Sequence, residues 1–102
     1  QVILNHLVFG MDIQSSIEAP RFSTHSQPNS FEPHESKPGR LAIEEDIGQE
    51  IGRKLSDLGH DVEWLTSRSD AVAGVCAISA NLETKTITGG ADPRRSGRAM
   101  GW

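Results

Sequence analysis

The most constraining feature of this sequence is residues 71–80, a stretch in which small and apolar residues occupy both sets of alternating positions. A strand that is apolar on both sides is typical of a sheet covered on both faces. We therefore predict a strand over residues 71–80 with cover on each side. The rest of the chain offers about two further strands and one long helix pattern. It can hardly supply the second covering layer.

Size sets the next limit. The chain has 102 residues, which fits one small domain or a piece of a larger one. A chain of this size buries roughly 60–65% of the surface that its unfolded form exposes, so its core is small. Cys76 is the only cysteine, so no disulfide within the chain can reinforce that core. Because position 1 is Gln and the chain starts inside a helical pattern, we expect the C-terminal portion of something longer.

Composition and charge exclude several classes of protein. Hydrophobic residues make up 35% and charged residues 24%, which argues against disorder of the whole chain and against a disulfide-rich secreted miniprotein. The balance of 14 acids to 10 bases, net −4, argues against a nucleic-acid partner. No apolar stretch approaches the roughly 18–20 residues that a membrane span needs. The apolar start, residues 1–9, lacks the features of a signal peptide.

Two short helices are predicted at the N-terminus. Apolar residues at helical spacing over residues 2–9 predict the first, which Gly10 ends. Asp12 is a candidate N-cap for the second, over residues 13–18, and Pro20 closes it. Residues 23–40 contain three prolines, four serines and one glycine, which predicts a loop with a short extended stretch near Phe31 to Glu35.

The clearest helix pattern follows this loop. Its apolar stripe comprises Ile43, Ile47, Ile51, Leu55 and Leu58. Glu44, Glu45 and Asp46 are expected at its N-terminal end, where the helix dipole favours acids. Glu50 and Lys54 form an i,i+4 pair, and Gly59 is the stop signal. Gly48 and Gly52 lie inside the predicted helix, on a face that should touch another backbone closely.

Strands dominate the remainder. Residues 61–65 alternate and predict a strand, residues 81–84 predict a turn, and residues 85–88 predict the returning strand of a hairpin. From Gly89 onward we expect irregular structure. Helices followed by strands predict an α+β fold, in which a sheet packs against helices.

Candidate chemistry is sparse. The four histidines, His6, His25, His34 and His60, are separated by 19, 9 and 26 residues, which does not predict a metal site. Cys76 is expected to be buried and inert in its apolar strand. Gly89, Gly90 and the following arginines could cradle an anion. The alternative is a tight turn in which Asp92 accepts hydrogen bonds from local backbone amides and the arginines pair with acids. No active site or cofactor is predicted from the residues alone.

Three blocks carry a family resemblance: GMDIQSSIEAPRF (residues 10–22), LGHDVEWL (residues 58–65) and GGADPRRSGRAMGW (residues 89–102). In this order and spacing they resemble the γ-glutamyltranspeptidase family. The resemblance implies an α+β fold, namely the C-terminal portion of an N-terminal-nucleophile hydrolase αββα sandwich, with residues 1–102 as a single incomplete domain. The family residues carried over are expected to be structural: Ala19, Pro20, Arg21, Gly59, His60, Asp92, Pro93, Arg94 and Arg95.

The resemblance also implies an activity for the parent protein. Family members cut themselves into a large and a small subunit, and the new N-terminal threonine attacks a γ-glutamyl amide with its own α-amine as base. That threonine and the other catalytic residues would lie upstream of Gln1. No catalytic, substrate-binding or metal residue and no cofactor is therefore expected in this chain. The substrate stays open between glutathione and other amides, as does the compartment.

Partners follow from the same resemblance. They are the large subunit, the N-terminal part of the small subunit, a small γ-glutamyl or amide substrate for the parent, and a second copy of the chain when it is isolated. The alternative function is a non-catalytic binding module that uses Arg94, Arg95 and Arg98 as an anion site.

Overall fold

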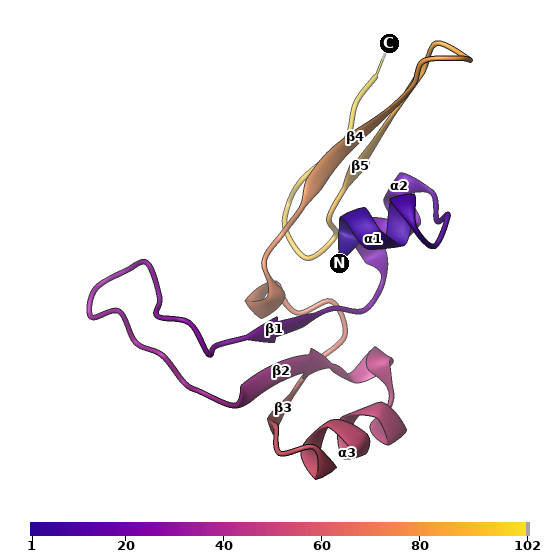
Figure 1. The fold of residues 1–102 in the computed structure, drawn as a ribbon. Helices are drawn as coiled ribbons and strands as arrows, with labels where there is room; N and C mark the ends of the chain where they lie inside the picture. The colour runs from indigo at the N-terminus through magenta and orange to yellow at the C-terminus, as the bar shows by residue number, and fades with distance from the viewer. Residues whose placement is uncertain (102) are drawn as a thin grey trace. The chain divides into compact units, whose positions relative to one another are not determined.

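The computed structural model describes residues 1–101, so Trp102, the last residue of the third block, lies outside the described part. The chain is α+β, as predicted. It divides into two compact units, one of Gln1–Ala19 with the chain from Ala73 onward, the other of Pro20–Val72. Each is described separately below (Figure 1).

The first unit contains helices α1 (Val2–Leu7) and α2 (Ile13–Glu18) and strands β4 (Cys76–Asn81) and β5 (Thr86–Ala91). Both helices lie where the sequence predicts them, although α1 ends at Leu7 instead of continuing to Phe9. The Asp12 side chain accepts a hydrogen bond from Ser15 N at 2.9 Å, which caps α2. Ala19, before Pro20, has extended angles and ends the helix. Figure 1 shows both short helices beside the hairpin.

The hairpin has one covered face. β4 and β5 pair antiparallel from Cys76 opposite Ala91 to Asn81 opposite Thr86. Residues directly opposite each other share a face. Ser79 and Gly90 lie on the face toward the helices, since His6 Nε2 is 2.8 Å from Ser79 Oγ and a Cβ on Gly90 would lie 2.8 Å from Ile17 Cδ1. We call this the helix face of the hairpin, and its opposite the open face.

Three predictions for this region were wrong. Residues 71–75 are not strand, since Asp70–Val72 form a 3₁₀ turn and β4 begins at Cys76. Cys76 is exposed, and so is Ile78 at 77%, because among the described residues only the C-terminal tail lies against the open face, at one end of it. Residues 89–91, which were expected to be irregular, belong to strand β5. β5 runs through Ala91 because the two glycines pair with β4 and Gly90 lies close against α2.

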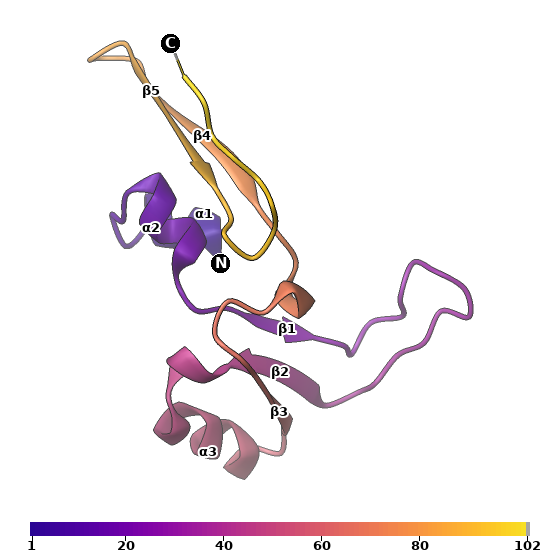
Figure 2. The same ribbon diagram turned by 180° about the vertical axis from the view of Figure 1, so that it is seen from behind.

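The second unit contains β1 (Phe22–Thr24), β2 (Arg40–Glu44), α3 (Gln49–Asp57) and β3 (Asp61–Leu65). The strand order is β1-β2-β3, with β1 antiparallel and β3 parallel to β2. A parallel neighbour needs a crossover, and α3 provides it. Figure 2 shows the three strands with α3 beside them. Residues 61–65 confirm the strand prediction, and Gly59 follows the helix end as expected.

The long helix predicted from Ile43 was wrong in its first half. Residues 40–44 form the central strand β2, in which Leu41, Ala42 and Ile43 are buried. A 3₁₀ turn, Glu45–Ile47, follows, and Gly48 adopts a φ of +97° that favours glycine before α3 begins. Ile43, Ile47 and Ile51 are spaced four residues apart, and this spacing alone does not distinguish a strand followed by a turn and a helix from one continuous helix. Glu44, expected at an exposed helix end, is fully buried.

The burial of the side chains on α3 also differs from the predicted apolar stripe. Ile51 is 50% exposed, whereas Ile47 and Leu55 are half-buried. Gly52 makes the expected close approach, but to the indole of Trp64 rather than to a backbone. The Glu50 to Lys54 pair is confirmed at 2.7 Å.

The loop between β1 and β2 is shorter than predicted. Residues 22–24 form β1, and Arg40 already belongs to β2. The stretch from Phe31 to Glu35 is not extended, since a bend and turn occupy its first three residues.

Candidate functional site

The best-defined cluster of buried polar groups lies where the chain leaves β5. Asp92 is 1% exposed, and its two carboxylate oxygens accept backbone hydrogen bonds from different segments. Oδ1 accepts from Arg94 N at 3.0 Å, and Oδ2 accepts from Val75 N at 3.0 Å. Arg95 N donates to Asp92 O at 3.2 Å. The predicted tight turn, with Asp92 bound to local amides, is confirmed.

Arg94 extends from this turn to the end of α2. Its side chain is buried, and Nη1 lies 3.2 Å from Asp92 Oδ1. Nη1 also donates to Ile17 O at 3.0 Å, and Nη2 donates to Ala19 O at 3.1 Å and to Glu18 O at 3.4 Å. Carbonyls at a helix C-terminus have no partner within the helix, and a cation there is favourable. We call the Asp92–Arg94 pair, with these carbonyls, the α2 clamp.

A second contact joins α2 to β5. Gln14 Nε2 donates to Ala91 O at 3.0 Å, and Ala91 N donates to Gln14 Oε1 at 3.1 Å. These bonds satisfy both backbone groups of a residue at the end of the strand. Sequence reasoning did not identify Gln14 as important, and its only signal was its position inside the first family block.

In the second unit, a buried carboxylate joins two segments. Glu44 Oε2 accepts from Arg21 N at 2.8 Å, and Oε1 accepts from Ser69 N at 2.8 Å. Glu44 N in turn donates to Arg21 O at 3.0 Å. Arg21 is 3% exposed. Nothing local in the sequence marked Glu44, because its partners lie 23 and 25 residues away.

The remaining family residues are more exposed. Gly59 and His60 follow α3, where Gly59 N donates to Ser56 O and His60 N donates to Leu55 O. Pro20 and Pro93 are exposed, and Pro93 lies in a turn.

The three arginines do not form one open cluster. Arg94 is buried in the α2 clamp, whereas Arg95 and Arg98 are exposed, with the Arg95 side chain against Gly74. The arrangement therefore does not support the alternative of a shared anion site.

Titratable and metal-ligating groups are dispersed. Across residues 1–101, no three His, Cys, Asp or Glu side chains come together in a way that could hold a metal ion. Hydrogen bonds from Ser15 hold the pKa of the Asp12 carboxyl below its ordinary value. Within the same described residues, no helix has the length and apolarity to cross a membrane.

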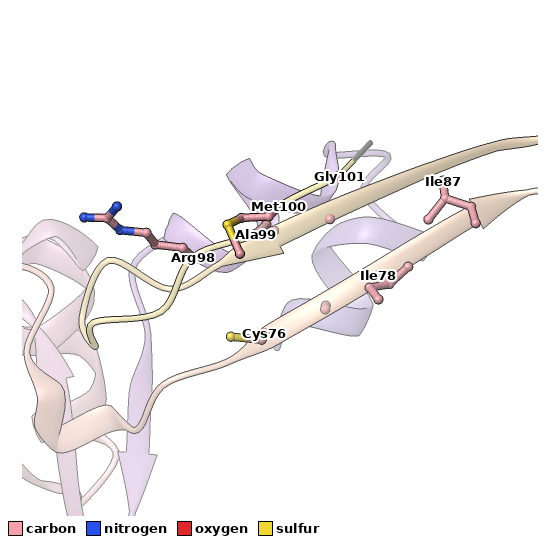
Figure 3. Close-up of a pocket in the computed structure, with 10 residues that line it drawn as sticks. Cys76, Ile78, Ile87, Arg98, Ala99, Met100 and Gly101 are labelled. Carbon is pink, nitrogen blue, oxygen red and sulfur yellow. The ribbon is translucent and has the colours of Figure 1, made fainter.

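The open face forms a hollow of about 740 Å³ with the C-terminal tail. Cys76 and Ile78 of β4, Ile87 of β5, and Met100 of the tail line it (Figure 3). A polar hollow of about 480 Å³ in the second unit lies between Thr24 and Arg40. The residues around this second hollow include Thr24, His25, Glu35 and Lys37. The α2 clamp and the Glu44 carboxylate each join backbone segments that are distant in sequence.

Comparison with known proteins identifies the family. A family model described as gamma-glutamyltranspeptidase matches residues 1–102. The chain is 31% identical over 101 residues to the glutathione hydrolase proenzyme of Bacillus subtilis (strain 168), covering 99% of this chain. It spans 15% of that protein's length.

Solved structures agree on the fold. A cephalosporin acylase from Bacillus halodurans matches with a TM-score of 0.80 at 22% identity, over 100% of this chain and 17% of its own. An acivicin-inhibited gamma-glutamyltranspeptidase matches with a TM-score of 0.70 at 25% identity, over 94% of this chain and 45% of its own. That structure is described as revealing critical roles for the enzyme's C-terminus in autoprocessing and catalysis. The fold is that of part of an N-terminal-nucleophile hydrolase, as predicted, and the chain belongs to the gamma-glutamyltranspeptidase family.

Proposed function

We propose that this chain is the C-terminal part of an enzyme that transfers or hydrolyses γ-glutamyl or related amide groups. The observation that carries the proposal is the family match over residues 1–102, in a chain that spans 15% of its curated relative. The nucleophilic threonine, with its α-amine as base, belongs to the remainder of the parent enzyme. The large subunit and the N-terminal part of the small subunit are thus the partners of this chain.

Within that enzyme, the family residues of this chain hold the C-terminal segment in place. Arg94 ties the turn after β5 to the last carbonyls of α2, including that of Ala19. Glu44 ties the backbone of Arg21 to the segment at Ser69. The C-terminus of a 25% identical relative is described as critical for autoprocessing and catalysis. We therefore treat Asp92 and Arg94 as positioning residues, which act through the backbone that they hold.

The test compares two proteins: the full reading frame that contains this chain, and the 102-residue chain alone. The full protein should appear as two polypeptides and turn over a γ-glutamyl anilide, glutathione or a cephalosporin side-chain amide. The chain alone should show no turnover, because acyl transfer without a nucleophile and oxyanion donors loses its largest contributions.

Two results would contradict the proposal. One is a full protein that stays uncut and inactive on all three substrates. The other is activity of the chain alone that survives repurification.

A further inference from the structure

The polar hollow of about 480 Å³ in the second unit is shaped by the loop between β1 and β2. Figure 1 shows the two arms of this loop extending from the strands. Backbone hydrogen bonds join the arms at two levels. At the base, His25 N donates to Arg40 O at 3.3 Å and Lys37 N donates to His25 O at 2.7 Å. Nearer the tip, Asn29 N donates to Glu35 O at 2.8 Å.

The residues that line the hollow come from these two levels and the chain beside them. Pro28, between the levels, has no backbone N–H to donate across the loop. The volume falls within the range of roughly 300–1,000 Å³ that is usual for small-molecule sites. Such sites are mostly apolar, but here every lining residue except Pro28 has a polar side chain. The hollow therefore fits a small and strongly polar ligand.

Charges of both signs line the hollow. Lys37 and Arg40 are cationic, and Glu35 is anionic. Within residues 1–101, the side chains of Lys37 and Glu35 make no hydrogen bond or ion pair, either with each other or with other residues. Arg40 is held in place by Glu63, which accepts from its Nε and pairs with its Nη2. One cation and one anion are thus left for a ligand to neutralise.

A ligand with a single kind of charge would match this set poorly. Glu35 would repel a simple anion, and Lys37 and Arg40 would repel a simple cation. A molecule that carries one carboxylate and one ammonium group can pair with both kinds of side chain. Arginine and lysine form charge-assisted hydrogen bonds with carboxylates, and a carboxylate accepts them from an ammonium.

We propose that this hollow binds the α-ammonium and α-carboxylate groups of an amino acid. Glu35 accepts hydrogen bonds from the ammonium, and Lys37 and Arg40 donate to the carboxylate. Two sources supply this pair of groups: a free amino acid, and the γ-glutamyl end of a peptide, in which both α groups are free. The inference goes beyond the proposed function, because it rests on the charges around the hollow and not on the chemistry of the parent enzyme.

The test is hydrogen exchange of the full-length parent, read by mass spectrometry in separate peptides. L-alanine represents the free amino acid, γ-glutamylglycine the γ-glutamyl end, and propionate is alanine without its ammonium group. A ligand that binds only the closed loop makes opening of the loop less frequent. We expect L-alanine, γ-glutamylglycine or both to slow exchange in residues 25–39 and to leave residues 76–91 unchanged. Propionate should bind at least about 5-fold more weakly than L-alanine.

Two variants test the assigned roles. Glu35→Gln and Lys37→Met should each weaken binding at least about 5-fold, the upper end for an exposed ion pair. Glu35→Gln should also abolish the preference for L-alanine over propionate. Both positions join the arms through backbone atoms, so the loop survives the substitutions. The matched controls are Glu32→Gln, in the same loop but outside the lining, and Lys85→Met in the β4–β5 turn, and neither should change the affinity.

The two ligands also distinguish the source. Protection by L-alanine alone assigns the hollow to free amino acids, and protection by γ-glutamylglycine alone assigns it to the γ-glutamyl end. The inference is overturned if neither ligand slows exchange in residues 25–39 at tens of millimolar. Equal binding of propionate and L-alanine, or unchanged affinity in both variants, would overturn it as well. Because binding is measured without turnover, an inactive parent that shows this protection contradicts the proposed function alone.

Discussion

Removing the guanidinium of Arg94 tests the α2 clamp. In Arg94→Met the side chain keeps most of its apolar length, but three backbone carbonyls lose a charged donor and the buried Asp92 carboxylate loses its ion-pair partner. Breaking a buried pair by removing one partner costs about 3–5 kcal/mol, because the other charge stays buried. We therefore expect Arg94→Met to lower the free energy of unfolding by about 3–5 kcal/mol.

Two further variants separate charge from geometry. Arg94→Lys keeps the positive charge but cannot reach Ile17 O, Glu18 O and Asp92 together as the planar guanidinium does. The Arg94→Lys protein should lose about 1.5–3 kcal/mol of stability, which corresponds to one hydrogen bond from a charged group. Asp92→Asn combined with Arg94→Met should show a coupling of about 1–3 kcal/mol, since the two residues are in contact.

The assay is urea unfolding followed by circular dichroism, with hydrogen exchange of the α2 amides as the local measurement. The matched control is Arg98→Met, which removes an exposed arginine four residues along and should change stability by less than about 0.5 kcal/mol. If Arg94→Met unfolds at the same urea concentration as Arg98→Met, and α2 exchanges no faster, the clamp contributes nothing and the reasoning is refuted.

Three further predictions follow from packing and titration. Gly52→Ala should cost about 1–3 kcal/mol and change the Trp64 emission, because a Cβ would overlap the indole; unchanged emission would contradict the packing. Ile43→Ala, at a site 1% exposed, should cost about 2–5 kcal/mol, whereas Ile51→Ala, at a site 50% exposed, should cost clearly less; equal urea midpoints would show that the strand is misplaced. The lowered pKa of Asp12 stabilises the fold above the ordinary carboxyl value of 3.8, and this contribution is lost as pH falls through the lower folded pKa. In Asp12→Asn, this pH-dependent contribution to the free energy of unfolding should be missing. If parent and variant show the same dependence of stability on pH, the hydrogen bond from Ser15 N to the Asp12 carboxylate does not stabilise the fold.

The sequence by itself predicted those features that depend on residues close to one another along the chain, such as helix ends and turns. Asp12, Pro20 and Gly59 mark helix ends through their own backbone preferences, so both N-terminal helices and the end of α3 were predicted correctly. Residues 61–65 were predicted correctly as a strand, and Trp64 of this strand lies against Gly52 of α3. The Asp92 turn was predicted for the same reason, since aspartate bonds to amides close to it in sequence.

Tertiary structure decided what depends on distant partners. Ile43 fits a helical stripe at steps of four, yet it lies in β2, because pairing with β1 and β3 buries the whole stretch 41–44. Arg94 reads as one of three tail arginines, but its carbonyl partners lie 75–77 residues away, and only the folded chain brings them together. The apolar pattern of residues 71–80 predicted a strand with two covered faces. The structure shows which face the helices α1 and α2 occupy, and that the other remains open because a chain this small has no second layer to place there.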